Sequence, residues 1–298
     1  MDGFISKIQR YSTKDGPGIR STVFAVGCNL SCRWCSNPEL IEAGKKILYH
    51  AERCVRCGAC TARSGGAIRL GASGCVIDRE KCANLDECAA ACCYDAYEQT
   101  GKWISPDDLA AKLIRDKVFY NKSGGGVTFS GGEPALQAEF FLETCKLLKK
   151  ESIHIALDTA GFCSWESLAP LLEAVDLVLY DIKVFDNGLH RQYTGADNRI
   201  ILENARRIAE MKKPMIIRAV IVPGVNDGEE EINNRLEFIH SLCAQRLDIL
   251  KYHRLGAGKY LCLGRQEPMS GVPECSDELA DQVLHKACSM GLAAGIGG

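Results

Sequence analysis

Short apolar segments alternate with longer amphipathic segments along most of the chain. The apolar segments are rich in Val, Ile, Leu and Phe, and they span 21–27, 126–130, 154–157, 177–180, 215–222 and 247–252. Runs of about four to eight residues with this character are typical of strands buried on both faces of a parallel sheet. Apolar residues at helical spacing predict helices between them, over 104–120, 136–150, 165–174, 198–211 and 229–243. The alternation predicts an α/β fold, either a doubly wound sheet or a barrel, with functional side chains on loops at the carboxyl ends of the strands.

One stretch interrupts this alternation. From about residue 45 to residue 101 the chain is rich in cysteine and glycine and has no long periodic segment. We therefore expect a small inserted domain over residues 49–100, with residues 1–48 and 101–298 together forming the α/β domain.

Composition and charge narrow the class of protein. Of the 298 residues, 46% are hydrophobic and 25% are charged, and the net charge is −2, so nothing indicates a surface for nucleic acid or an anionic membrane. No uncharged apolar run approaches the roughly 18 residues that span a bilayer. The first twenty residues carry several charges and lack the apolar core of a signal peptide, so we expect no secretory signal and a cytoplasmic location.

The number and the clustering of the cysteines indicate metal binding. There are 17, of which three lie at positions 28, 32 and 35 and eight lie between positions 54 and 93. The odd number and the expected cytoplasmic location argue against a disulfide scaffold. Clustered thiols in a reducing compartment usually bind metal, so we expect metal centres in these two regions and core packing for the six scattered cysteines.

The first cysteine group directly follows the first predicted strand. Cys28, Cys32 and Cys35 are spaced so that three thiolates can surround one point. Such a group suits a cubane iron–sulfur cluster with one iron left open. It also suits a zinc site completed by a fourth ligand such as His50, and bare core packing is a further alternative.

A glycine-rich turn follows the second predicted strand, where residues 130–134 read Ser-Gly-Gly-Glu-Pro. Gly131 and Gly132 would let the backbone approach a ligand closely. On its own, such a segment is more typical of a plain turn before a helix.

Charged residues mark the later strands. Asp158 and Asp181 end two neighbouring strands, where their carboxylates could bind a monovalent cation or the polar groups of a cofactor; helix capping is the alternative. Arg218 lies within an apolar strand, where an unpaired charge is costly, which predicts an anionic partner. His253 follows the last strand and is a further candidate, although a lone histidine is more often structural.

The spacing of Cys28, Cys32 and Cys35, with Trp34 before the last cysteine, resembles the radical S-adenosylmethionine (radical SAM) superfamily. In that superfamily the open iron chelates the amino and carboxylate groups of S-adenosylmethionine, and one electron cleaves the sulfonium to a 5′-deoxyadenosyl radical. A fourth protein thiolate would block the chelating iron. The resemblance implies that the catalytic residues are Cys28, Cys32, Cys35 and Lys183. It implies cofactor contacts from Trp34, Cys35, Ser36, Gly131, Gly132, Glu133, Asp158, Asp181, Ile182, Lys183, Arg218 and, at the adenine, His253.

Further motifs narrow the resemblance to the activating enzymes of glycyl radical enzymes. DGPGIR over 15–20 precedes the first strand, and DTAG, YDIK, VPGxND and YHRLG follow in that order along nearly the whole chain. The family implies a partial (β/α)6 barrel and an oxidoreductase of the EC 1.97.1 type. Its radical abstracts the pro-S α-hydrogen of one glycine in a partner enzyme. By position, Asp15 and its loop would help to hold the partner's glycine loop.

The inserted segment resembles the ferredoxin-like domain with two clusters in the longer activating enzymes. Cys54, Cys57 and Cys60 have ferredoxin spacing, but Ser64 stands where the fourth cysteine of the run is expected. Eight thiolates would serve two [4Fe–4S] clusters; besides those three, the expected metal ligands are Cys75, Cys82, Cys88, Cys92 and Cys93. Because the fourth cysteine of a run crosses to the other cluster, Cys92 would join the first cluster, and the second would need Cys75 and Cys93. One cluster with a zinc site, or a single cluster, is the alternative.

Clusters in the insert would relay electrons from a flavodoxin or ferredoxin to the catalytic cluster; shielding of that cluster and partner docking are alternatives.

For the whole chain, two functions compete with glycyl radical activation. The chain could be a radical SAM enzyme that acts on a small molecule or another peptide, or a non-catalytic electron-transfer or zinc-binding protein. Metal analysis separates these, because three cubanes predict about twelve irons per chain whereas zinc without sulfide would exclude radical chemistry.

Overall fold

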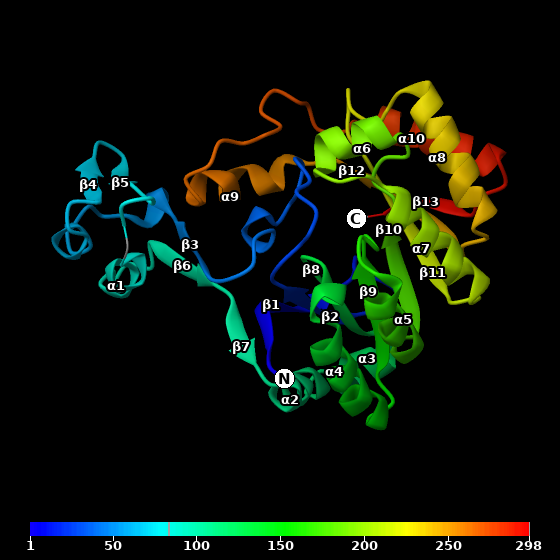
Figure 1. Ribbon diagram of the computed structural model, residues 1–298, viewed down its shortest axis with the longest axis horizontal. Coiled ribbons are helices and arrows are strands. Elements are labelled where there is room, and N and C mark those ends of the chain that lie inside the picture. Colours follow the sequence, from blue (N-terminus) through cyan, green and yellow to red (C-terminus); the bar gives the residue numbers. More distant parts are fainter. Residues whose placement is uncertain (83, 298) are drawn as a thin grey trace.

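A nine-stranded sheet forms the centre of the computed structural model, which describes residues 1–82 and 84–297 (Figure 1). The strand order is β13-β12-β11-β10-β9-β8-β2-β1-β7. Neighbouring strands from β2 through β8 to β13 pair in parallel, and β1 and β7 add an antiparallel edge. This mixed α/β fold with a central parallel sheet confirms the predicted class at that level. The strands are β1 (Gly3–Ser12), β2 (Arg20–Ala25), β7 (Lys102–Ile104), β8 (Gly126–Gly131), β9 (His154–Thr159), β10 (Leu177–Asp181), β11 (Met215–Ile221), β12 (Arg246–Lys251) and β13 (Ala294–Gly297).

All six predicted strands are present, as β2 and β8 to β12, with ends shifted by one or two residues. The sequence pattern missed three strands of this sheet: β7, which has only three residues and lies at the edge, and β1 and β13. β1 lies next to the edge of the sheet and carries polar residues on its exposed positions, and β13 is a short, glycine-rich strand at the opposite edge. Neither has the buried apolar character that identifies a central strand.

Helices follow most of the parallel strands. They are α2 (Pro106–Ile114), α3 (Lys117–Ser123), α4 (Ala138–Lys150), α5 (Trp165–Ala174), α6 (Asn187–Thr194), α7 (Arg199–Glu210), α8 (Glu229–Ser241), α9 (Ala257–Cys262) and α10 (Asp277–Ser289). Of these, α4, α5, α7 and α8 confirm predicted segments, whereas α6, α9 and α10 were not predicted. Serine caps fix the starts of α2, α5 and α10, where each side-chain oxygen accepts a hydrogen bond from a backbone N–H in the first turn. Among the described residues, no helix is long and apolar enough to cross a membrane.

The single helix predicted over 104–120 is wrong, because the chain breaks it at Asp116. The Asp116 carboxylate is buried, where it accepts hydrogen bonds from Arg10 Nη1 and Ser21 Oγ, each at 2.8 Å. Tying this residue to β1 and β2 turns the chain, and α3 begins at the next residue.

The cysteine-rich segment lies apart from the main sheet (Figure 1). Its stem is the antiparallel pair β3 (Lys46–Tyr49) and β6 (Tyr97–Thr100), within which lie the hairpin β4 (Ile68–Gly71) and β5 (Gly74–Ile77) and the short helix α1 (Leu85–Ala90). The segment has a small buried core of its own, separate from the large core around the main sheet. α9 lies between the segment and β12 and contacts β3 (Figure 1).

Candidate active site

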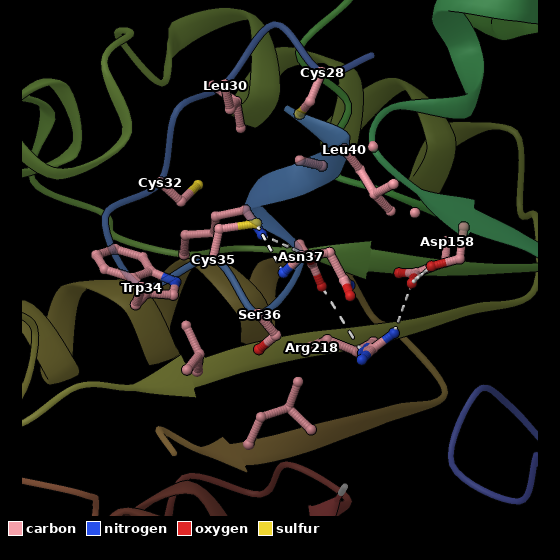
Figure 2. A pocket seen from close by; sticks show the side chains of 18 of the residues that line it. Cys28, Leu30, Cys32, Trp34, Cys35, Ser36, Asn37, Leu40, Asp158 and Arg218 are labelled. Carbon is pink, nitrogen blue, oxygen red and sulfur yellow. Dashed lines mark hydrogen bonds and ion pairs between the residues drawn. The ribbon is translucent and has the colours of Figure 1, made fainter. Parts of the chain in front are cut away.

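The loop after β2 carries the first cysteine group and brings three thiols to one cavity. Cys28, Cys32 and Cys35 all line it, and Figure 2 shows them on the loop that also carries Trp34 and Ser36. The backbone N–H groups of Ser31 and Arg33 donate to the carbonyls of Thr194 and Tyr193 at the end of α6, at 2.8 and 2.9 Å. The loop is therefore held by the main domain, to which the side chains of Asn29 and Ser31 also donate hydrogen bonds.

Burial keeps the three thiols neutral. It raises the pKa of Cys28 to about 11 and that of Cys32 to about 12, and it raises the pKa of Cys35 as well. The Lys183 ammonium acts in the opposite direction on all three. A bound metal removes this barrier, because a coordinating thiol loses its proton outright.

The cavity has a volume of about 280 Å³ and collects residues from the carboxyl ends of β2, β8, β9, β10, β11 and β12. Most of the predicted site residues line it: Cys28, Cys32, Trp34, Cys35, Ser36, Gly131, Gly132, Asp158, Asp181, Lys183, Arg218 and His253. Parallel strands end at one edge of a sheet, so motifs far apart in the sequence meet here, as the strand pattern predicted.

A row of charged side chains crosses the strand ends inside the cavity. Arg218 Nη1 lies 2.9 Å from Asp158 Oδ2, which also accepts a hydrogen bond of 2.6 Å from Ser130 Oγ (Figure 2). Lys183 Nζ lies 2.7 Å from Asp181 Oδ2, and Arg218 Nε lies 3.9 Å from the other oxygen of Asp181. The negative charges of Asp158 and Asp181 are thus balanced by the positive charges of Lys183 and Arg218. An anionic partner for Arg218 was predicted because this residue lies in an apolar strand.

The two carboxylates respond differently to burial. Burial raises the pKa of Asp158, and Arg218 only partly offsets this. Burial would also raise the pKa of Asp181, but Lys183 and Arg218 outweigh it and hold that pKa below its usual value. Asp181 therefore stays ionised beside the thiols.

The donor set fits a cluster with one open iron. Three cysteines line this cavity, and no fourth cysteine is among the lining residues in the described part of the chain. His50, the candidate fourth zinc ligand, lies in the stem of the cysteine-rich segment, where its Nε2 is 3.0 Å from Glu98 Oε2. Across residues 1–82 and 84–297, no three Cys, His, Asp or Glu side chains converge closely enough to hold a single metal ion.

Two predicted cofactor contacts lie behind the cavity wall. The Glu133 carboxylate is 2% exposed and accepts hydrogen bonds from Thr159 Oγ1 at 2.7 Å, the Ala160 N–H at 3.1 Å and the Ala135 N–H at 3.2 Å. Burial raises the pKa of Glu133 to about 7 despite these donors. Ile182 is also fully buried. In this structure both residues support the wall, and neither is among the residues that line the cavity.

A second brace of the cysteine loop could not be found from sequence. Lys259 Nζ, on α9, donates to Asn37 Oδ1 and Glu39 Oε1, each at 2.7 Å, just after the last cysteine of the motif. The Asn37 N–H in turn lies 3.4 Å from Cys35 Sγ. No local signal links residues more than 200 positions apart, because only the tertiary fold brings them together.

The turn after β8 has no room for a side chain at Gly132. A Cβ there would lie 2.1 Å from the carbonyl oxygen of Gly27, directly before Cys28. We expect Gly132→Ala to lower the free energy of unfolding by about 2–3 kcal/mol, because backbone rather than a flexible side chain must move. The matched control is Gly228→Ala, where nothing lies within 4 Å of the added Cβ. Thermal unfolding of both variants measures the difference, and equal midpoints would contradict the contact.

Comparisons with known proteins agree with this geometry. The family model described as the radical SAM superfamily matches residues 22–236. An isethionate sulfite-lyase activating enzyme of Nitratidesulfovibrio vulgaris is 39% identical over 91% of this chain and 90% of its own length. A trans-4-hydroxy-L-proline dehydratase activating enzyme of Clostridioides difficile is 37% identical over 87% of each chain.

A solved domain of a pyruvate-formate lyase-activating enzyme from Bacteroides vulgatus is 32% identical, with a TM-score of 0.50, over 58% of this chain and 99% of the domain. Family model, full-length relatives and solved domain all point to the same chemistry. The chain belongs to the radical SAM superfamily and, within it, to the activating enzymes of glycyl radical enzymes.

Proposed function

We propose that Cys28, Cys32 and Cys35 hold the catalytic [4Fe–4S] cluster of this activating enzyme and that S-adenosylmethionine binds beside it. The observation that carries the proposal is the single cavity lined by these three thiols and by the charged row at the strand ends. When bound, the cluster and S-adenosylmethionine supply the one-electron cleavage that yields a 5′-deoxyadenosyl radical, which is general for the superfamily.

The charged row would orient the polar groups of S-adenosylmethionine. Lys183 and Arg218 offer cationic donors to its carboxylate, and Asp158 and Asp181 offer acceptors to its hydroxyl and ammonium groups. The two carboxylates already face Arg218 and Lys183, so a monovalent cation at this place would share them with two protein cations.

The walls of the cavity would position the rest of the molecule. Gly131 and Gly132 provide backbone without side chains, and Trp34 and Ser36 lie on the cysteine loop itself. His253, at the end of β12, lines the rim and is the candidate contact for the adenine. Glu133 and Ile182 would act through the wall, by fixing the turn after β8 and the end of β10.

The partner is a glycyl radical enzyme, and we propose that its glycine loop enters beside Asp15. Asp15 lines the cavity from the DGPG turn, on the side of β1 and β2. The Asp15 carboxylate is held by Ser12 Oγ at 2.6 Å and Thr22 Oγ1 at 2.7 Å, so the turn has a fixed position at the rim.

The cysteine-rich segment 49–100 would act as a separate electron-relay domain that takes electrons from a flavodoxin or ferredoxin. Its support is structural: the segment has its own core and its own stem, and α9 links it to the loop that carries Cys28, Cys32 and Cys35.

Anaerobic reconstitution with iron and sulfide tests the proposed function. The reduced protein should convert S-adenosylmethionine into equal amounts of methionine and 5′-deoxyadenosine. Purified isethionate sulfite-lyase and trans-4-hydroxy-L-proline dehydratase, named in the two relatives, are the first partners to test for a glycyl radical by electron paramagnetic resonance. A protein that carries its clusters but releases no 5′-deoxyadenosine would contradict the proposal.

A further inference from the structure

The cysteine-rich segment contains two runs of the same spacing, and both are incomplete. Positions 54, 57, 60 and 64 of the first run correspond to positions 82, 85, 88 and 92 of the second, with steps of three, three and four. This is the spacing with which a bacterial ferredoxin holds two cubane clusters. Ser64 replaces the fourth cysteine of the first run, and Leu85 replaces the second cysteine of the second run.

The two replacements fall on the same cluster site. In such domains a cluster takes the first three cysteines of one run and the fourth of the other. The first site therefore keeps all four ligands: Cys54, Cys57, Cys60 and Cys92. The second site would take Cys82, Leu85, Cys88 and Ser64, so only two of its four ligand positions hold cysteine.

The structure places five cysteines at the first site. Cys54, Cys57, Cys60, Cys75 and Cys92 line one small cavity. Cys75 Sγ lies 3.9 Å from Cys54 Sγ and 3.7 Å from Cys60 Sγ. Cys75 therefore lies at the first site and not at the second, to which the sequence analysis assigned it. The first site then has five nearby thiols, one more than a cubane cluster needs.

The second site is filled by packed protein. Cys82 and Cys88 are 8% and 0% exposed, and their sulfurs lie 3.9 and 4.0 Å from the same atom, Asn84 Oδ1. Both belong to the small apolar core, as does Cys60 of the first site, and what distinguishes the second site is that Leu85, which packs against this core, stands at one of its ligand positions. The Asn84 side chain therefore lies beside both thiols, and its amide donates to the Arg63 carbonyl at 2.6 Å.

The Ser64 hydroxyl is already used by the backbone. It donates to the Thr61 carbonyl at 2.9 Å and accepts from the Ile68 N–H at 3.0 Å, in a side chain only 5% exposed. A neutral hydroxyl with both roles satisfied has no reason to become an iron ligand. Cys93 could supply only one more thiol, and its side chain is exposed.

We propose that this segment holds one cubane cluster, on Cys54, Cys57, Cys60 and Cys92, and that its second ferredoxin site has been replaced by apolar core. The activating enzyme then carries two clusters rather than three. The inference rests on the proposed electron-relay function of the segment, and it identifies the first site as the relay.

Removing the catalytic ligands isolates the segment in the full chain. In the variant Cys28→Ala/Cys32→Ala/Cys35→Ala, reconstituted anaerobically, we expect about four irons and four sulfides per chain, and an electron paramagnetic resonance spectrum without coupling between clusters. About eight irons would overturn this inference alone and leave the relay function intact. A chain without iron would overturn the relay itself.

Two further variants test the assignment of residues. Adding Cys82→Ala and Cys88→Ala to the triple variant should leave the iron content unchanged, whereas loss of the cluster would overturn the inference. Adding Ser64→Cys and Leu85→Cys instead should restore the second site and double the iron content, with spectral broadening from two neighbouring reduced clusters. A soluble Ser64→Cys/Leu85→Cys protein that gains no iron would show that these are not the missing ligand positions.

Discussion

Replacing Cys32 by alanine is expected to reduce the formation of 5′-deoxyadenosine to the background of a reaction without protein. The variant keeps two thiols of the loop, and two cannot hold a cubane in the cavity with one iron open. Cys32 is 8% exposed, and burial raises its pKa to about 12, so without iron it contributes only a neutral thiol. The iron content should fall by about four atoms, to that of the relay cluster alone.

The matched control is Cys288→Ala, which makes the same change at an exposed cysteine on α10. It should leave iron content and cleavage unchanged. Product analysis by mass spectrometry and iron analysis on one preparation measure both quantities. If the Cys32 variant cleaved S-adenosylmethionine at more than about a tenth of the parent rate, the proposed ligand set would be wrong.

The placement of the cavity could be predicted from sequence because it depends on a rule of topology. Parallel strands present their carboxyl ends at one edge, so Asp158, Asp181 and Arg218 had to meet once their segments were identified as neighbouring strands. The pairing of Asp181 opposite Arg218 on β10 and β11 is the register that joins the charged row. Local patterns sufficed here because each residue's position follows from its own strand.

Contacts between distant segments could not be predicted in this way. Glu133 was expected to face a ligand, yet it accepts hydrogen bonds from the end of β9, because the turn after β8 packs against that strand end. Lys259 supports the cysteine loop from α9, and nothing near either segment indicates the contact. In the cysteine-rich segment, counting thiols suggested two clusters with Cys75 at the second, but the fold brings Cys75 to Cys54 and Cys60 of the first, a contact that no local pattern indicated.

Arg20 offers the second large effect, because it anchors the DGPG turn from within the protein. Its side chain is completely buried, and burial lowers its pKa to about 10. Arg20 Nε donates to Thr128 Oγ1 at 2.6 Å, and Nη1 donates to the Pro17 carbonyl at 3.1 Å. Thr128 Oγ1 in turn donates to the Asp15 carbonyl at 2.7 Å. The guanidinium therefore ties both sides of the turn to β8.

We expect Arg20→Met to destabilise the protein by about 3 kcal/mol, because it leaves several buried acceptors without a donor. The matched control is Arg199→Met at the start of α7, where the side chain is 82% exposed and its loss should cost less than about 1 kcal/mol. Thermal unfolding under anaerobic conditions should separate the two by roughly 5–10 °C.

The same variant distinguishes positioning from mere stability. If Arg20 fixes the turn that receives the partner's glycine loop, Arg20→Met should keep its iron and cleave S-adenosylmethionine without partner at close to the parent rate. Radical transfer to the partner should fall by about tenfold or more, since a shift of about 1 Å in a positioned group can cost two orders of magnitude. Spin counting on the partner beside 5′-deoxyadenosine measurement gives both rates. If cleavage and radical transfer declined equally, Arg20 would have only a structural role, because a general loss of folded protein lowers both rates by the same factor.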